Sequence, residues 1–234
     1  MHQSSTEETV RVLVECLKLS RGATRIGLDD LAARAQTNES STRRVLARVL
    51  PGYDSSSISI NRRERVQIAI EVARIGRFRE AAKDLTWQEF EEFGNECLNE
   101  AGFRTDKNVR VNGDGRAWQI DIVGFRGNLV LTVDCKHWTA PSYTSRLEIA
   151  AEHQRQATSH LLTTRAEQSL AGDAAIQALA LILTLMEPPA QFLSGAVLVP
   201  VERLQSFLNE VTPYDANLPW IDSTAAVVEN PIRQ

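Results

Sequence analysis

The sequence has few cysteines, few histidines and no long hydrophobic run. Its three cysteines, Cys16, Cys97 and Cys135, lie far apart, and its four histidines show no metal-ligand spacing. This pattern excludes a disulfide framework and gives no support for a zinc knuckle, so any bound metal is expected to be a hard cation held by oxygen. The longest apolar run, residues 178–186, is much shorter than the ~20 residues that a membrane-spanning helix needs.

The N-terminal segment also lacks a targeting pattern. Residues 1–15 are polar and acidic and do not show the basic-then-apolar order of a signal peptide. The expectation is therefore a cytoplasmic, prokaryotic-type intracellular protein without membrane contact.

The composition is that of an ordinary globular protein, with 43% hydrophobic and 24% charged residues in a chain of 234, long enough for two domains. The net charge of −4 hides an asymmetry between the two parts of the chain. Residues 1–86 contain 15 Lys and Arg against 11 Asp and Glu, while residues 87–234 contain 11 against 19. A basic module followed by an acidic one is compatible with phosphate-backbone binding in the first and metal binding in the second.

Helical spacing dominates the first part of the chain. Apolar periodicity predicts helices over residues 6–19, 28–35 and 38–48, with Asn38 or Ser40 as the cap of the third. The second and third helices, joined by a three-residue turn, form a helix-turn-helix pattern. The alternating residues 55–60 then predict a short wing, and a long helix beginning near Asn61 is interrupted at Gly76.

Residues 6–85 resemble the winged helix-turn-helix family. The resemblance implies sequence or phosphate contacts through the third helix and the wing, with Arg43, Arg44 and Arg48 as candidate DNA contacts. Arg62 and Arg63, in the first turn of the long helix, are further candidates. The alternative is a helical scaffold for dimerisation or domain packing, with these arginines on a solvated face.

Lysine is scarce, with four among the 26 basic residues, and one of the four stands in a distinctive place. Residues 117–125 and 129–136 predict two antiparallel strands joined by a turn at residues 126–128. Asp134 and Lys136 are two apart on the second strand, so they project from the same face while Cys135 points away. Asp121 on the first strand is expected alongside them.

These strands belong to a longer order of elements. Thr86 and Glu89 form a capping-box pattern at the start of a helix that ends near Gly102. The pattern predicts strands over residues 103–111, 117–125 and 129–136, a helix over 146–163, strands over 178–185 and 196–199, and a helix over 201–208. The tail after residue 208 carries no readable chemistry.

This order, with FEEFGNECLNEAGF at 90–103, IDIVG at 120–124 and DCKHW at 134–138, resembles the PD-(D/E)XK nuclease superfamily, in particular its Mrr-like and archaeal resolvase-like branches. Gln119 and Ile120 stand where the proline of the motif name would be. The resemblance implies an α/β restriction endonuclease-like core, a mixed central sheet with flanking helices, at residues 86–210. An all-α-rich winged helix domain at 1–85 precedes it, and a tail at 211–234 follows.

The resemblance also implies a site that binds Mg²⁺, with Mn²⁺ as a substitute. Asp121 and Asp134 would be metal ligands, the main-chain carbonyl of Cys135 a third, and Glu91 an acidic ligand from the preceding helix. Lys136 would orient the attacking water or stabilise the developing charge, a role that arginine fills poorly because it does not release its proton. Gln154 would help to position Lys136 or the water. The alternatives are a strand-end salt bridge for the three charged residues, a solvated face for Glu91 and a packing hydrogen bond for Gln154.

The implied function is a metal-dependent endonuclease that hydrolyses DNA phosphodiester bonds by metal-activated water, in DNA repair or restriction. Its partners would be double-stranded or branched DNA and a second copy of the chain, since one such site cuts one strand. Two rival hypotheses stay open: a non-catalytic DNA-binding protein built on a nuclease scaffold, and a structure-specific or RNA nuclease.

Overall fold

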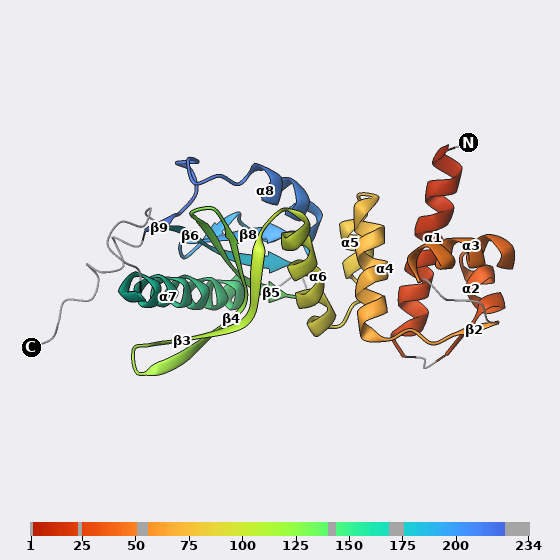
Figure 1. The fold of residues 1–234 in the computed structure, drawn as a ribbon, viewed down its shortest axis with the longest axis horizontal. Coiled ribbons are helices and arrows are strands. Elements are labelled where there is room, and N and C mark those ends of the chain that lie inside the picture. The colour runs from red at the N-terminus through yellow and green to blue at the C-terminus, as the bar shows by residue number, and fades with distance from the viewer. Residues whose placement is uncertain (1, 23–24, 51–55, 140–143, 169–175, 223–234) are drawn as a thin grey trace, which may run out of the picture. The chain divides into compact units, whose positions relative to one another are not determined.

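The computed structural model describes residues 2–22, 25–50, 56–139, 144–168 and 176–222. The chain divides into two compact units, one up to Phe93 and one from Gly94 onward (Figure 1). This division falls inside helix α6 (Trp87–Glu100), whereas the sequence predicted a domain boundary just before that helix. The domain assignment of the sequence stays a prediction, and residues 223–234 of its tail and residue 55 of its wing lie outside the described residues.

The first unit is mainly helical. Its helices bury an apolar core that includes Leu13, Leu17, Leu31, Leu46 and Ile68. The elements in chain order are α1 (His2–Ser20), β1 (Ile26–Gly27), α2 (Leu28–Arg34), α3 (Glu39–Val49), β2 (Ser57–Ile58), α4 (Arg62–Arg74) and α5 (Phe78–Ala82).

The predicted helix-turn-helix elements are present as α2 and α3. The Asn38 side chain accepts a hydrogen bond from the Ser41 N–H at 2.9 Å, so Asn38 is the cap of α3. The short strand β2 pairs with β1 in a two-stranded antiparallel sheet, with Ile26 opposite Ile58. These are the elements that a winged helix contains, and the assignment to that family stays a prediction.

The predicted break at Gly76 separates α4 from α5. Gly76 has a φ of 84°, in the left-handed region that a residue without Cβ adopts at low cost. The start of α1 at His2 lies before the predicted start at residue 6, because the polar residues 2–5 give no apolar period from which a helix boundary can be read.

The second unit is built on one mixed sheet. Its main path runs β3-β4-β5-β6-β8-β7, with β9 beside the start of β6. The β3–β4 and β4–β5 pairs are antiparallel, while β5, β6 and β8 run parallel. The strands are β3 (Arg104–Gly113), β4 (Arg116–Arg126), β5 (Leu129–Lys136), β6 (Gln177–Thr184), β7 (Phe192–Leu193), β8 (Ala196–Pro200) and β9 (Ile221–Asp222). The predicted α/β class is confirmed, while the two-residue strands β7 and β9 were not predicted from the sequence.

Helices cover both faces of this sheet. Helix α7 (Thr144–Gln168) lies along one face, where its Ala157 and Leu161 join the cluster that contains Trp118 and Val130 (Figure 1). On the opposite face, a Cβ on Gly94 of α6 would lie 3.0 Å from Leu183 of β6, so this close approach favours glycine. The 3₁₀ turn η1 (Val201–Arg203) and helix α8 (Leu204–Glu210) follow β8, where the sequence predicted one helix. Among the described residues, each helix is too short or too polar to span a membrane.

The side chains of β4 change the face of the sheet to which they point near Asp121. Trp118, Ile120 and Val123 all join the cluster under α7, which strict two-residue alternation does not allow. On the neighbouring strand, Asn108 has a φ of 53°, and the pairs on either side of it bracket Asp121. The irregularity in the two strands brings the carboxylate of Asp121 to the point where β4 separates from β5, because the last β4–β5 pair at this end is Ile122 with Val133.

Candidate active site

Asp134 and Lys136 form an ion pair at the end of β5. The Lys136 Nζ donates a hydrogen bond to Asp134 Oδ1 at 2.9 Å and lies 2.7 Å from Oδ2. The contact to Oδ2 lacks hydrogen-bond geometry, so Oδ2 is a buried oxygen without a hydrogen bond among the described residues. The two side chains project together, as the two-residue spacing predicted.

Asp121 reaches the same strand from β4. Its Oδ2 accepts a hydrogen bond from the Cys135 N–H at 2.9 Å. The next carbonyl, that of Lys136, accepts from the Leu185 N–H at the end of β6. Because successive main-chain groups of a strand face opposite edges, the Cys135 carbonyl faces the Asp121 side. Two carboxylates and one main-chain oxygen are thus directed toward the end of β5.

The local charge is incompletely neutralised. Burial and the neighbouring Asp134 carboxylate raise the pKa of Asp121 to about 6, against the Cys135 hydrogen bond and the positive charge of Lys136, which lower it. Two adjacent carboxylates with one lysine leave an excess of negative charge in a partly desolvated place. Such an arrangement favours an additional cation.

The residues present fit a hard divalent cation. Carboxylate and carbonyl oxygens are the ligands that Mg²⁺ prefers, and the Asp134 Oδ2 without a hydrogen bond is a buried acceptor of that kind. Within the described part of the chain, no three His, Cys, Asp or Glu side chains are grouped as a metal-ligand set. The protein ligands available here are therefore the two carboxylates and the Cys135 carbonyl, and water would complete the coordination.

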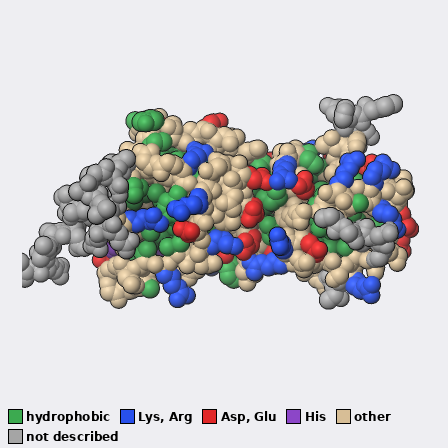
Figure 2. Space-filling view, in the orientation of Figure 1, with side chains coloured by type: hydrophobic (Ala, Val, Ile, Leu, Met, Phe, Trp, Pro, Cys, Tyr) green, Lys and Arg blue, Asp and Glu red, His purple; other side chains and the backbone are tan. Residues whose placement is uncertain are grey.

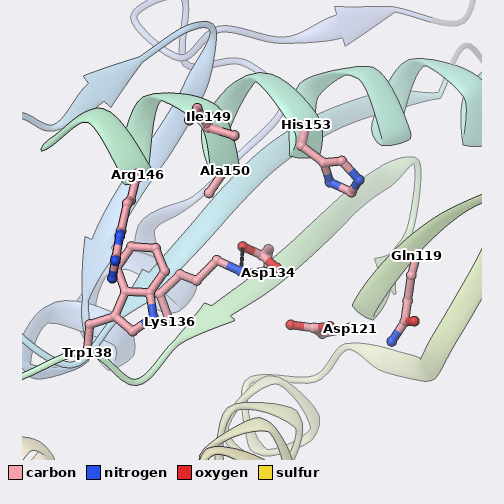
Figure 3. Close-up of a pocket in the computed structure, with 9 residues that line it drawn as sticks. All are labelled: Gln119, Asp121, Asp134, Lys136, Trp138, Arg146, Ile149, Ala150 and His153. Atoms are coloured by element: carbon pink, nitrogen blue, oxygen red, sulfur yellow. Dashed lines mark hydrogen bonds and ion pairs between the residues drawn. The ribbon is translucent and has the colours of Figure 1, made fainter. Parts of the chain in front are cut away.

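These residues open onto a hollow of about 470 Å³ between the sheet and α7 (Figure 3). Lys136 extends toward Asp134, and Asp121 lies across from them, while α7 contributes side chains from the other side. The lining residues are Gln119, Asp121, Asp134, Lys136, Trp138, Arg146, Ile149, Ala150 and His153. Trp138 lies beside Lys136, with Nζ 5.7 Å from the ring centroid.

Three polar residues of this hollow, Gln119, Arg146 and His153, were missed from the sequence. Arg146, Ala150 and His153 are spaced by about one helical turn each. This spacing is a signal in the sequence from which their common position on one side of α7 could have been predicted. The sequence prediction for this helix named only Gln154, which follows His153 and lies outside the stripe of Arg146, Ala150 and His153. Burial lowers the pKa of His153, with Asp134 raising it and Arg116 and Lys136 adding to the lowering, so neutral imidazole is favoured there.

Gln154 lies next to this stripe but not in the hollow. Its side chain is fully buried on α7, and neither of its amide atoms has a hydrogen-bond partner among the described residues. Glu91 is half-buried on the part of α6 that belongs to the first unit. The roles predicted for Gln154 and Glu91 stay predictions.

The arginines predicted to bind DNA differ in exposure and contacts. Arg44 and Arg48 are exposed on α3, whereas Arg43 is half-buried. Arg63 is exposed at the start of α4, and Arg62 donates a hydrogen bond to the Gln88 carbonyl at 3.0 Å and lies 3.8 Å from the Glu92 carboxylate. On the face shown in Figure 2, basic and acidic side chains are interspersed and form no continuous patch of one sign.

Two known proteins are similar to parts of this chain. An uncharacterized protein from Archaeoglobus fulgidus is 29% identical over 138 residues, which are 58% of this chain and all of that protein. A crystal structure of protein VC1899 from Vibrio cholerae covers 88% of this chain at 13% identity, with a TM-score of 0.36. The chain spans 55% of the length of that structure's chain.

The family comparison concerns the part of the chain that carries the site. Residues 82–184 match the model of the Mrr catalytic domain family, described as a restriction endonuclease. This range includes Asp121, Asp134 and Lys136, and it confirms the resemblance that the sequence motifs indicated. Residues 82–184 carry a restriction endonuclease domain of the Mrr catalytic kind, within the PD-(D/E)XK restriction endonuclease-like superfamily.

Proposed function

We propose that this protein is a Mg²⁺-dependent endonuclease that hydrolyses DNA phosphodiester bonds with water as the nucleophile, leaving a 5′-phosphate and a 3′-hydroxyl. The observation that carries the proposal is the convergence of Asp121, Asp134 and Lys136 at one hollow. These residues lie within the range that matches the restriction endonuclease family.

Asp121 and Asp134 would hold the metal, with the Cys135 carbonyl as a third protein ligand. Asp121 Oδ2 is already used by the Cys135 N–H, and Asp134 Oδ1 by Lys136. The second oxygen of Asp134, Oδ2, makes no hydrogen bond but lies 2.7 Å from the Lys136 Nζ, so a cation bound there would share this oxygen with the lysine. A bound divalent cation would supply neutralisation of the phosphate charge and a lower pKa for a coordinated water.

Lys136 has a separate role. Its ammonium group is held by Asp134 at the mouth of the hollow and remains partly exposed, with 24% of the side chain accessible. From there it can donate a hydrogen bond to a non-bridging phosphate oxygen or to the attacking water. A point charge on a flexible stem suits this role better than the rigid, delocalised charge of arginine.

The basic residues of the first unit would supply DNA affinity. Arg43, Arg44 and Arg48 on α3, together with Arg62 and Arg63, are proposed to contact phosphates or base edges. Exposure favours Arg44, Arg48 and Arg63 most, since Arg62 already donates to a main-chain carbonyl. Contacts to phosphates position a protein on the duplex, while contacts to base edges specify sequence.

Three further assignments belong to the proposal. A homodimer would place two sites on the two strands of a duplex. Glu91 would add a carboxylate to the metal site, and Gln154 would position Lys136. The intact Asp121, Asp134 and Lys136 favour this enzyme over a DNA-binding protein on an inactive nuclease scaffold.

The test is nicking of supercoiled DNA with Mg²⁺, compared with the same reaction in EDTA. Lys136→Ala is expected to lower the rate at least about 100-fold, the lower range for loss of a positioned proton-transfer group. Lys107→Ala removes an exposed lysine of β3 in the same unit and serves as the matched control. Equal rates for wild type and Lys136→Ala would refute the proposal. Binding without Mg²⁺-supported cleavage would favour the non-catalytic alternative, and faster cleavage of RNA or four-way DNA would redefine the substrate.

A further inference from the structure

Ile149 of α7 is an exposed apolar side chain beside the candidate active site. With 72% of its surface accessible, it is one of the few large hydrophobic residues exposed among those the structure describes. It lines the hollow that contains Asp121 and Asp134, and it also lines a second hollow of about 430 Å³. A single exposed apolar side chain is common on protein surfaces, but this one lies between two hollows, and one of them contains the candidate catalytic groups.

The two hollows meet along one edge of α7. Ile149 and His153 are four residues apart, so they lie one above the other on the helix surface, and both line both hollows. Figure 3 shows these two side chains on the same helix above the carboxylates. The other residues of the second hollow are Arg116, Glu148, Glu152 and Gln156. Ile149 and His153 thus form a ridge with the carboxylates on one side and polar side chains on the other.

The ridge is held in place from below. The His153 ring lies 4.8 Å from the Trp118 ring, centroid to centroid, with the planes inclined by 41°. Trp118 is itself buried, and its Nε1 donates a hydrogen bond to the Gly113 carbonyl at 3.0 Å. The Arg116 guanidinium lies over the Trp118 ring at 3.5 Å. An imidazole fixed in this way presents a defined aromatic face.

We propose that this ridge holds one base of the DNA out of its stack, with Ile149 as the wedge and the second hollow as the base subsite. The inference rests on the proposed endonuclease function, because a phosphate bound beside Asp121 and Asp134 would bring its own nucleotide to the ridge. Every base has a face that can stack on an imidazole or an aliphatic side chain. Glu152 and Gln156, already joined by a hydrogen bond of 2.6 Å, offer acceptor and donor groups to the base edge.

The substrate class follows from the cost of unstacking. Extruding a base costs least where the base is mismatched or already unpaired. The preferred substrate is therefore DNA with a local defect, such as a mismatch or a branch point, in preference to a continuous duplex. Apolar wedges at opened base steps are an established way in which proteins bind distorted DNA.

The experiment measures unstacking directly. A duplex carries 2-aminopurine at a mismatched position, and its fluorescence is recorded with increasing protein in Ca²⁺ instead of Mg²⁺, because Ca²⁺ binds the same oxygen ligands with looser geometry. A denaturing gel establishes that the strand stays intact during the measurement. Wild type is expected to raise the fluorescence on binding and to bind the mismatched duplex about tenfold more tightly than the matched one. Ile149→Ala is expected to lose most of the fluorescence rise and about tenfold in affinity for the mismatched duplex, in line with the removal of one stacking interaction.

Phe192→Ala is the matched control, since it removes another exposed apolar side chain from the same unit, outside both hollows. It is expected to behave as wild type, and circular dichroism and thermal melting establish that both variants fold. The proposal is overturned if wild type binds without a fluorescence rise, or if Ile149→Ala and Phe192→Ala behave alike. These results are independent of the nicking assay. If nicking depends on Lys136 and the fluorescence rise does not depend on Ile149, the endonuclease proposal holds and the base subsite is refuted. If the base is unstacked but no DNA is nicked, the base subsite holds and the endonuclease proposal is refuted.

Discussion

The Asp121 carboxylate accepts a hydrogen bond from the Cys135 main chain, across the point where β4 and β5 stop pairing. In a continuous sheet this N–H would bond to a main-chain carbonyl of β4. The side chain of Asp121 replaces that carbonyl, which keeps the donor satisfied while the two strands separate. The separation leaves room at the end of β5 for the groups that a catalytic site requires. The point where β4 and β5 stop pairing is therefore also the point where the candidate site forms.

Asp121→Asn is expected to stabilise the metal-free protein above about pH 6. The pKa of folded Asp121 is raised from 3.8 to about 6, so the proton favours the folded state. This stabilisation is complete below about pH 4 and is lost as the pH rises through about 6. Asparagine keeps an acceptor for the Cys135 N–H and carries no charge, so the expected gain at pH 8 is on the order of 2 kcal/mol in the free energy of unfolding.

Urea unfolding in EDTA at pH 8 and pH 4 checks this expectation, and the difference should vanish at the lower pH. Added Mg²⁺ is expected to stabilise wild type but not the variant, because the metal requires the ionised carboxylate. Asp106→Asn changes an exposed aspartate of β3 and controls for surface charge. Identical stability of Asp121→Asn and wild type at pH 8 would show that Asp121 is not strained by its charge.

Arg65 and Glu89 form a buried ion pair in the first unit. The Arg65 Nε donates to Glu89 Oε1 at 2.8 Å, and the Arg65 Nη atoms donate to the main-chain carbonyls of Leu17 and Asp84, both at 2.6 Å. Only 5% of each charged side chain is accessible. Arg65→Met would leave Glu89 buried without its partner, at an expected cost of about 3–5 kcal/mol.

The measurement is urea unfolding of the whole chain at pH 7. Arg63→Met, two residues earlier and exposed, is the control and should leave the midpoint unchanged. If both variants shift the midpoint equally, Arg65 contributes no more than a surface arginine. The double variant Arg65→Met with Glu89→Leu is expected to recover part of the loss, because it removes the unpaired charge as well.

Local sequence patterns predicted the contacts between residues of the same strand or the same helical turn. The pairing of Asp134 with Lys136 follows from their two-residue spacing, and the N-cap at Asn38 and the capping box of Thr86 with Glu89 follow from residue type and position. Each of these depends on neighbours within a few residues. The order of the strands around Asp121 was predictable for the same reason, because hairpin partners are adjacent in the chain.

Contacts between distant segments were not predictable in this way. No local pattern distinguishes Arg65 from the other arginines at the start of α4, and Glu89 is predicted only as part of a capping box, yet their side chains meet across 24 positions of the chain. His153 was missed because helix phase decides which stripe of α7 faces the hollow, and an error of one residue rotates the helix by about 100°. The face change of β4 near Asp121 shows in the sequence only as the adjacent apolar pair Ile122 and Val123, and the positive φ of Asn108 on the neighbouring strand could not be predicted from that pair.

The DNA contacts of the first unit can be separated from catalysis by salt dependence. Replacing Arg44 and Arg48 together by alanine is expected to weaken DNA binding and to reduce the slope of log affinity against log salt by about 0.9 for each phosphate that the protein no longer neutralises. Fluorescence anisotropy with a labelled duplex in EDTA measures both quantities. Arg74→Ala, which removes an arginine paired with Glu71 on α4, should leave the slope unchanged. An unchanged slope in the double variant would assign α3 to packing or dimerisation.

Substitution of Gln154 can show whether this residue serves stability or function. Its amide is fully buried without a hydrogen-bond partner among the described residues, and an unsatisfied buried polar group costs about 1–3 kcal/mol. Gln154→Met has nearly the same length and no amide, so it is expected to stabilise the folded protein by about 1 kcal/mol or more. If the glutamine is retained to position Lys136 or water, the same variant should nick DNA more slowly at unchanged DNA affinity. Thermal melting, the nicking rate and anisotropy, measured on one preparation, separate a packing role of Gln154 from a positioning role. A gain in stability with full activity would show that Gln154 is a packing residue. A loss of stability would show that its amide is hydrogen-bonded in solution.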